Sequence, residues 1–244
     1  MIVNWRSYLM EARYECVRAL RLPGFIVPLV LLPVALYLFF GAVMAVPNRT
    51  TQIDLLIFTG FAVMGAMGPG MFGFGVSVAA EREQGLLKLK RVLPMPPAAY
   101  IVAKMFMAVL VTLIITLLMM TAGMAAGKVS LAASRLAALA ATLAIGSLPF
   151  CAMGLLVGSR VRARSAPAFI NLAYLPMIYL SGFLVPLPKS FDPVTRYSPA
   201  YHLDRLALHA VGAPSDAPLK HVLILAAVTV LFGGLAIRRL SRSE

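Results

Sequence analysis

Residues 53–79 read IDLLIFTGFAVMGAMGPGMFGFGVSVA, and residues 80–100 continue as AEREQGLLKLKRVLPMPPAAY. From Leu55 to Ala79 there is no acidic or basic residue. A helix needs about 20 apolar residues to cross the roughly 30 Å hydrocarbon core of a bilayer, where only helices and closed barrels satisfy their backbone. This run is too long and too uniformly apolar for the alternating strands of a barrel. It therefore predicts a transmembrane helix that leads into a charged segment.

The composition extends this interpretation to the whole chain. Of the 244 residues, 61% are hydrophobic and 13% are charged, and the mean hydropathy is +0.88. An ordinary soluble domain is about 45–50% apolar and about 25% charged. The chain is therefore expected to be an all-α integral membrane protein. Residues 1–244 are expected to form a single domain, because no soluble stretch approaches the roughly 50 residues of a further folding unit.

Six apolar runs predict six transmembrane helices, at residues 24–46, 53–79, 101–126, 136–158, 165–185 and 219–237. In the second run, Gly68, Pro69 and Gly70 predict a kink or local unwinding. The runs hold almost no acidic or basic residues, whereas a proton-coupled carrier or ion pump usually needs one within the membrane. Energy for any transport is therefore expected to come from another molecule.

The positions of Lys and Arg predict the orientation. Fifteen of the 22 fall in segments that are cytoplasmic if both termini are cytoplasmic, and such segments normally carry the excess of positive charge. The net charge of +13 is then explained by topology and lipid headgroups, without nucleic acid.

Two segments outside the spans have patterns of their own. Residues 1–22 contain a candidate amphipathic helix over 3–21, with an apolar stripe that includes Trp5, Leu9 and Cys16, and this helix is expected to lie in the membrane interface. It would serve either as a simple anchor or as a mechanical link to a partner. Residues 186–218 combine prolines with aromatic residues, and predict short helices on the outer face that lie in the headgroup layer or dip into the membrane.

The charged segment 80–98 joins the second and third spans on the cytoplasmic side. Residues 80–91 are predicted to be helical, with Gly85 allowing a sharp turn at the membrane surface. Pro94, Pro96 and Pro97 would then end the helix and redirect the chain. A short, rigid surface helix of mixed charge is suited to contact with a soluble partner. The alternative is a merely solvated basic loop.

Several motifs are set aside. Gly68, Gly70 and Gly73 match the G-x-G-x-x-G string of dinucleotide sites, but no strand precedes them and they lie within a predicted span, where close packing or a kink is the better explanation. The spacing of Gly154 and Gly158 favours helix packing within the chain over a dimer contact. The three histidines have no metal-ligand spacing, and no metal site, catalytic residue or nucleotide site of the chain's own is expected.

Two stretches resemble type-2 ATP-binding-cassette exporter permeases. Residues 80–88, AEREQGLLK, followed by Pro94-Met-Pro-Pro and Lys104, resemble the family's E-R-E-x-G-T-L-E helix, proline step and lysine. Leu86 stands where the family often has Thr, and Lys88 where it often has Glu. Residues 181–204, from SGFLVPLP to YSPAYHLD, resemble its G-x-x-x-P…L-P…P-x-x-Y-x-x-D segment.

The resemblance implies a permease of the bacterial inner membrane that dimerises, with a homodimer favoured, and binds two copies of a separate ATPase. ATP and Mg would then be bound by the ATPase and not by this chain. It implies outward movement of an amphiphilic substrate: a drug, lipid, glycolipid or polysaccharide. A non-transporting membrane scaffold that recruits a soluble partner is the alternative, and a membrane-embedded enzyme is weakly supported because no polar constellation is evident.

The resemblance also assigns residues to three groups. Contact with the ATPase is expected of Glu81, Arg82, Glu83, Gly85, Leu86, Leu87, Lys88, Arg91, Pro94 and Pro97. A substrate pathway at the dimer interface is expected to include Phe61, Met64, Met67, Phe72, Asn171, Tyr174, Met177 and Tyr179, for each of which ordinary helix packing is an equal alternative. The outer-face segment is marked by Pro186, Pro188, Pro199, Tyr201 and Asp204.

Overall fold

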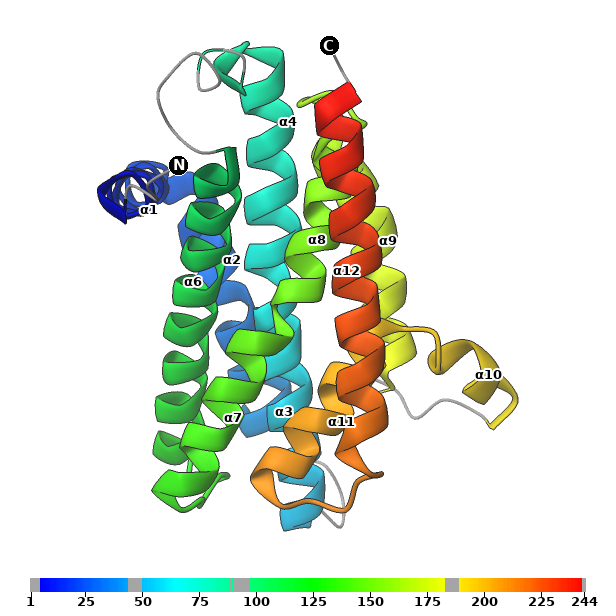
Figure 1. Cartoon of the computed structure of the whole chain (residues 1–244). Coiled ribbons are helices and arrows are strands. Elements are labelled where there is room, and N and C mark those ends of the chain that lie inside the picture. The colour runs from blue at the N-terminus through cyan, green and yellow to red at the C-terminus, as the bar shows by residue number, and fades with distance from the viewer. Residues whose placement is uncertain (1–4, 44–49, 88, 90–96, 183–188, 243–244) are drawn as a thin grey trace.

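The computed structural model describes residues 5–43, 50–87, 89, 97–182 and 189–242, in which long helices lie side by side and no strand occurs (Figure 1). The helices are α1 (Trp5–Leu20), α2 (Pro23–Leu36), η1 (Tyr37–Val43), α3 (Thr51–Gly68), η2 (Pro69–Phe74), α4 (Gly75–Glu83), α6 (Pro97–Ala125), α7 (Ala133–Gly146), α8 (Leu148–Gly158), α9 (Ala166–Ser181), η3 (Lys189–Phe191), α10 (Asp192–Thr195), α11 (Pro199–Val211) and α12 (Pro218–Arg242).

Among the described residues, five stretches of helix are long and apolar enough to cross a membrane. They are Pro23–Gly41, Thr51–Glu83, Ala99–Ala125, Ala133–Gly158 and Pro218–Arg239. These confirm five of the predicted runs. The remaining run, 165–185, coincides with α9, which has 16 residues and is about 24 Å long at 1.5 Å per residue. This is shorter than the roughly 30 Å of a bilayer core, and residues 183–185 of the run lie outside the described part of the chain.

The second run folds as one 33-residue stretch of helix in which α3, η2 and α4 follow one another without a break. Its centre, η2, is a π-helix that begins at Pro69. A proline lacks the N–H that an α-helix would use, and π-helical turns accommodate such interruptions. The local departure from α-helix predicted at residues 68–70 is therefore confirmed.

Glycines allow this long helix to approach α8 closely. A Cβ atom on Gly154 would lie 2.5 Å from the carbonyl oxygen of Gly70, and one on Gly158 would meet the carbonyl oxygen of Gly75. Only glycine fits at these two places, because the opposing atoms belong to backbone that cannot rotate away. Gly70, Gly154 and Gly158 therefore serve one contact within the chain, whereas a Cβ on Gly68 would face Leu29 and one on Gly73 would meet open space.

The start of the 80–91 segment differs from the expectation. Glu81, Arg82 and Glu83 are the last turn of α4 and continue the long helix, so they do not begin a separate surface helix. The helix ends because Gly85 takes a φ of +72°, a left-handed conformation that glycine adopts without strain. The sharp turn predicted at Gly85 is thus confirmed, but it comes after the three charged residues.

Both ends of the described chain lie at the same end of the bundle (Figure 1). Helix α1, the end of α4 and the C-terminal end of α12 lie at one end, while α11 lies toward the other (Figure 1). We call the first of these the α1 end. Helix α11 is held between α7, α12, α3 and α9, and most of its side chains are buried. The short helices expected within 186–218 are therefore present, and one of them is part of the bundle.

Candidate functional site

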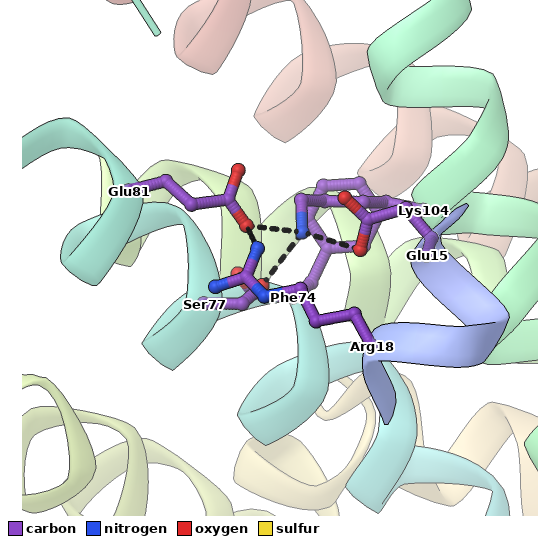
Figure 2. A network of polar contacts seen from close by, with 6 residues as sticks. All are labelled: Glu15, Arg18, Phe74, Ser77, Glu81 and Lys104. Carbon is purple, nitrogen blue, oxygen red and sulfur yellow. Dashed lines mark hydrogen bonds and ion pairs between the residues drawn. The ribbon is translucent and has the colours of Figure 1, made fainter. Parts of the chain in front are cut away.

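A buried polar cluster joins α1, α4 and α6 at the α1 end of the bundle. Its centre is Lys104 of α6, whose side chain is 4% exposed. The ammonium group donates hydrogen bonds to Glu15 Oε2 at 3.0 Å, Ser77 Oγ at 3.0 Å and Glu81 Oε1 at 2.8 Å (Figure 2). An ammonium group has three donors, so these partners use all of them. We call Glu15, Arg18, Ser77, Glu81 and Lys104 the joint cluster.

The charges of the joint cluster balance. Glu81 is fully buried, and its carboxylate also accepts a hydrogen bond from the guanidinium group of Arg18, which is partly exposed. The cluster thus contains two carboxylates and two cations, drawn from three helices. Burying a charge costs several kcal/mol unless it is paired and hydrogen-bonded, so the pairing specifies where α1 and α6 lie against α4.

The next residue of α4 reaches a fourth helix. Arg82 donates hydrogen bonds to the carbonyl oxygens of Ser159 and Val161, the latter at 2.7 Å. These carbonyls follow α8, where the last groups of a helix lack partners within the helix. The guanidinium group satisfies them and fastens the end of α4 to the end of α8.

The turn after α4 is open to solvent. Glu83 and Gln84 are exposed, Leu86 and Leu87 are half-buried, and Leu89 is exposed. Leu87 packs against a cluster that includes Phe74, Tyr100 and Leu155. A force applied to this turn would therefore be transmitted to α4 and, through the joint cluster and Arg82, to α1, α6 and α8.

The residues predicted to contact an ATPase thus divide into three sets. Glu81 is buried, and half-buried Arg82 is hydrogen-bonded to the end of α8, so both side chains hold helices together. Glu83, Gly85, Leu86 and Leu87 lie at the exposed turn. Lys88, Arg91 and Pro94 lie outside the described residues, as does the side chain of Pro97, whose backbone begins α6. Contact with an ATPase stays a prediction.

The predicted pathway residues are mostly in the core. Phe72 packs against the main hydrophobic cluster. The buried members of the predicted set belong to that cluster: Phe61, Met64, Met67, Tyr174 and Met177. Tyr174 donates a hydrogen bond to the carbonyl oxygen of Met64 at 2.9 Å, and its ring meets that of Phe72 edge to face. These contacts fasten α9 to α3 and η2. Asn171 and Tyr179 are exposed on α9.

The outer-face markers are also divided. Pro186 and Pro188 lie outside the described residues, Pro199 is the first residue of α11, and Tyr201 is half-buried. Asp204 is buried, and desolvation raises the pKa of its carboxyl group to about 7 against the opposing effect of Arg205. The carboxyl group therefore stays largely protonated at mildly acidic pH, where an ordinary aspartate is ionised.

Two histidines that the sequence gave no reason to pair meet in the structure. His202 of α11 and His221 of α12 are buried, with their Nδ1 atoms 2.7 Å apart. His202 Nε2 donates to the carbonyl oxygen of Arg196 at 2.8 Å, so the neutral ring accepts at Nδ1 and His221 Nδ1 must donate. Burial lowers the pKa of His202. This neutral pair fastens α11 to α12.

The joint cluster could be only partly anticipated. Glu81 and Lys104 flank one predicted loop. Two opposite charges at the ends of neighbouring spans could therefore have suggested an ion pair between the spans. Glu15 and Arg18 lie 89 and 63 residues from their partners. No periodicity relates such positions, and only the crossing of α1 over α6 brings them together.

Comparisons with known proteins agree with this architecture. Residues 8–204 match the family model described as ABC-2 type transporter, a match that runs from α1 to Asp204 of α11. Over 224 residues the chain is 28% identical to the protein named "Putative transport permease YvfS" of Bacillus subtilis (strain 168). That alignment covers 89% of this chain and 90% of the relative.

Proposed function

The chain belongs to the ABC-2 type transporter family, and from this premise we propose that it is the membrane subunit of an ATP-driven exporter whose ATPase binds the α1 end of the bundle. Members of the family are multi-pass membrane transport subunits that generally work with an ATP-binding-cassette ATPase. The proposal adds the place of coupling, the direction of transport and the class of substrate.

The joint cluster is the observation that carries the proposal. An ATPase changes shape as it binds and hydrolyses ATP, and this movement must reach helices in the membrane. The exposed turn at residues 84–87 directly follows α4, whose last turn is tied to α1 and α6 by Glu81 and to α8 by Arg82. A push on this turn would move four helices together, whereas a turn on a flexible loop would absorb it.

The remaining features of the proposal concern the assembly. We place both termini in the cytoplasm, because the α1 end carries the Arg-rich turn after α8 as well as Arg82. We propose helix α9 as the sixth crossing. Its exposed side, with Asn171 and Tyr179, faces a second copy of the chain and the pathway. The exposed apolar side chains of α9, such as Leu172 and Leu175, would suit a bulky amphiphile such as a drug, lipid, glycolipid or polysaccharide.

Co-purification tests the coupling. The probe is an ATPase with a phosphate-binding loop that is encoded beside this chain, co-expressed and captured through a tag on the permease. Changing Glu83→Lys and Leu89→Asp together, both at exposed positions, is expected to lower ATPase recovery at least fivefold. Ser130→Asp, exposed at the opposite end, is the matched control and should leave recovery unchanged.

The same preparation separates an exporter from a membrane scaffold. In reconstituted vesicles the complex should hydrolyse ATP and move fluorescent lipid or drug probes, and the Glu83→Lys and Leu89→Asp variant should do neither. Normal ATPase recovery with the double variant would disprove coupling at this turn. Intact binding without movement of any amphiphile in the panel would support the scaffold.

A further inference from the structure

An apolar groove lies beneath α1, between α2 and α6. It has a volume of about 420 Å³ and is lined by side chains that include Cys16, Ala19, Ile26, Val30, Met107 and Leu110. From Met107 to Ile114 the groove follows α6 for seven residues, which is about 10 Å at 1.5 Å per residue. Its walls offer nothing that could orient a polar ligand.

The position of the groove relative to α1 indicates its depth in the membrane. Helix α1 lies crosswise to the long helices (Figure 1), with Trp5 and Tyr14 exposed. Exposed Trp and Tyr side chains are typical of the headgroup level, and amphipathic helices lie there in the plane of the interface. A groove that begins at Cys16 and Ala19 and extends along α2 and α6 therefore opens into the acyl-chain region directly below the headgroups.

Two exposed arginines lie close in sequence to the residues of α1 that line the groove, and they indicate which headgroup would bind. Arg13 lies one turn before Cys16 on α1, and Arg21 follows Ala19 at the turn into α2; both arginines are exposed. The nearby acid Glu15 is already hydrogen-bonded to Lys104 in the joint cluster. Guanidinium groups bind phosphate through paired hydrogen bonds and attract anionic lipid surfaces.

We propose that this groove is a binding site for one anionic phospholipid, with an acyl chain between α2 and α6 and the phosphate held by Arg13 and Arg21. The site is separate from the substrate pathway proposed along α9. A second hollow of about 210 Å³ shares Ala19 and Met107 with the groove and is also lined by Glu15 and Arg18. The lipid would therefore lie directly beside the joint cluster and support the position of α1.

Native mass spectrometry of the delipidated chain in a non-ionic detergent tests the site. Phosphatidylglycerol is expected to bind one molecule per chain at least fivefold more tightly than phosphatidylcholine with the same acyl chains. Arg13→Gln with Arg21→Gln should lower the affinity for phosphatidylglycerol about fivefold or more, since each basic residue near a membrane surface contributes about that factor. The control pair is Arg162→Gln with Arg164→Gln, exposed after α8, which should keep wild-type binding.

Filling the groove tests the acyl-chain half of the proposal. Val27 lines the groove and is 47% exposed, so Val27→Trp should occupy it and reduce binding of phosphatidylglycerol at least fivefold. Val222→Trp on α12, where the valine is 49% exposed, is the matched control. An unchanged thermal midpoint in lipid-free detergent establishes that each variant is folded.

Three results would overturn the proposal. The first is equal affinity for the two lipids, and the second is equal loss of binding in the control variants. The third is a change in the dimer fraction of Val27→Trp with no change in bound lipid, which would assign the groove to a second copy of the chain.

Discussion

At the scale of single residues, Lys104 is a buried cation whose charge must be compensated by neighbouring carboxylates. Its ammonium group is 4% exposed and depends on Glu15 and Glu81 for compensation. Replacing such a group by hydrophobic residues together with its partner can be nearly neutral, whereas removing one partner leaves an uncompensated charge. The cluster therefore acts less as a source of stability than as a device that permits one arrangement of three helices.

A double-mutant cycle measures this dependence. Glu81→Gln should lower the free energy of unfolding in detergent by about 3 kcal/mol, because Arg18 then loses its buried partner and Lys104 keeps only Glu15 as a counter-charge. Glu81→Leu with Lys104→Leu should lower it by less than the sum of the two single changes to leucine, with a coupling energy of about 1–3 kcal/mol. Glu83→Gln, exposed two residues later, is the control. Equal effects of Glu81→Gln and Glu83→Gln would contradict the assignment.

Asp204 gives the chain a pH dependence of known sign. Its pKa is raised by desolvation to about 7, so the folded chain binds a proton more tightly than the unfolded chain. The corresponding stability is fully present below the unfolded pKa of 3.8 and is lost as the pH rises from about 4 through 7. His202 contributes in the opposite sense within this range, because its pKa is lowered, so the effect of Asp204 must be measured as a difference between the wild type and a variant that lacks the carboxyl group.

Thermal unfolding of the wild type and of Asp204→Asn between about pH 4.5 and pH 7.5 isolates the contribution of Asp204. The wild-type midpoint should fall relative to that of Asp204→Asn as the pH rises over this range, and the difference should change little above it. Asp216→Asn is the control, because the hydrogen bond from Lys220 lowers the pKa of this exposed carboxyl group and it is ionised throughout. A difference between the wild-type and Asp204→Asn midpoints that does not change with pH would refute the raised pKa of Asp204.

At the scale of elements, the contact of α8 with η2 and α4 sets how closely the central helices approach. In a bilayer, lipid is as apolar as the side chains, so helices associate through close packing and small residues. Gly70 and Gly75 face Gly154 and Gly158 across this contact. The distance between the helices is therefore set by backbone atoms and leaves no room for adjustment by side chains.

Alanine substitutions test this contact. Gly154→Ala or Gly158→Ala should each lower the free energy of unfolding by about 1–3 kcal/mol, because the added methyl group meets a carbonyl oxygen and the helices must separate. Gly234 of α12 has open space where a Cβ would lie, so Gly234→Ala should be neutral or stabilising by about 0.5–1 kcal/mol. A loss for Gly234→Ala as large as that for Gly158→Ala would contradict a role of close packing. Thermal or denaturant unfolding in detergent provides the measurement.

At the scale of the whole molecule, two groups of polar contacts lie at opposite ends of the bundle. The α1 end contains the joint cluster, Arg82 and the exposed turn after α4, and the last turn of α4 connects all three. The opposite end contains α11, held by the His202–His221 pair and surrounded by four helices. Because α3, η2 and α4 form one continuous helix between these ends, a displacement of the turn can reach α11, which α3 contacts.

Cysteine labelling tests which side of the membrane the α1 end faces. In a variant with Cys16 and Cys151 replaced by serine and alanine, single cysteines at Thr50 and Ser190 should react with a membrane-impermeant reagent added to intact cells. A cysteine at Ser165, beside the Arg-rich turn, should react only after the membrane is opened. The reverse pattern would place the α1 end outside and refute an ATPase bound there from the cytoplasm.

Much of this fold could be predicted from local chemistry. The apolar runs located the five long spans, because the bilayer imposes a length of apolar helix that is visible along the chain. Pro69 marked the π-helix, and Gly85 marked the turn, because each residue acts through its own backbone. The glycines of the second and fourth runs indicated close packing, although not which helix each would face.

The sequence by itself therefore determined an all-helical membrane protein of this family, its long spans and its backbone irregularities. Only the tertiary structure decided which groups meet: Glu15 with Lys104, Arg82 with the end of α8, and His202 with His221. It also shows that Glu81, which was expected at a surface, is buried and compensates the charge of Lys104. The physical reason is that lipid acts on each segment separately, whereas pairing of buried charges depends on distant segments that only packing brings within a few ångströms.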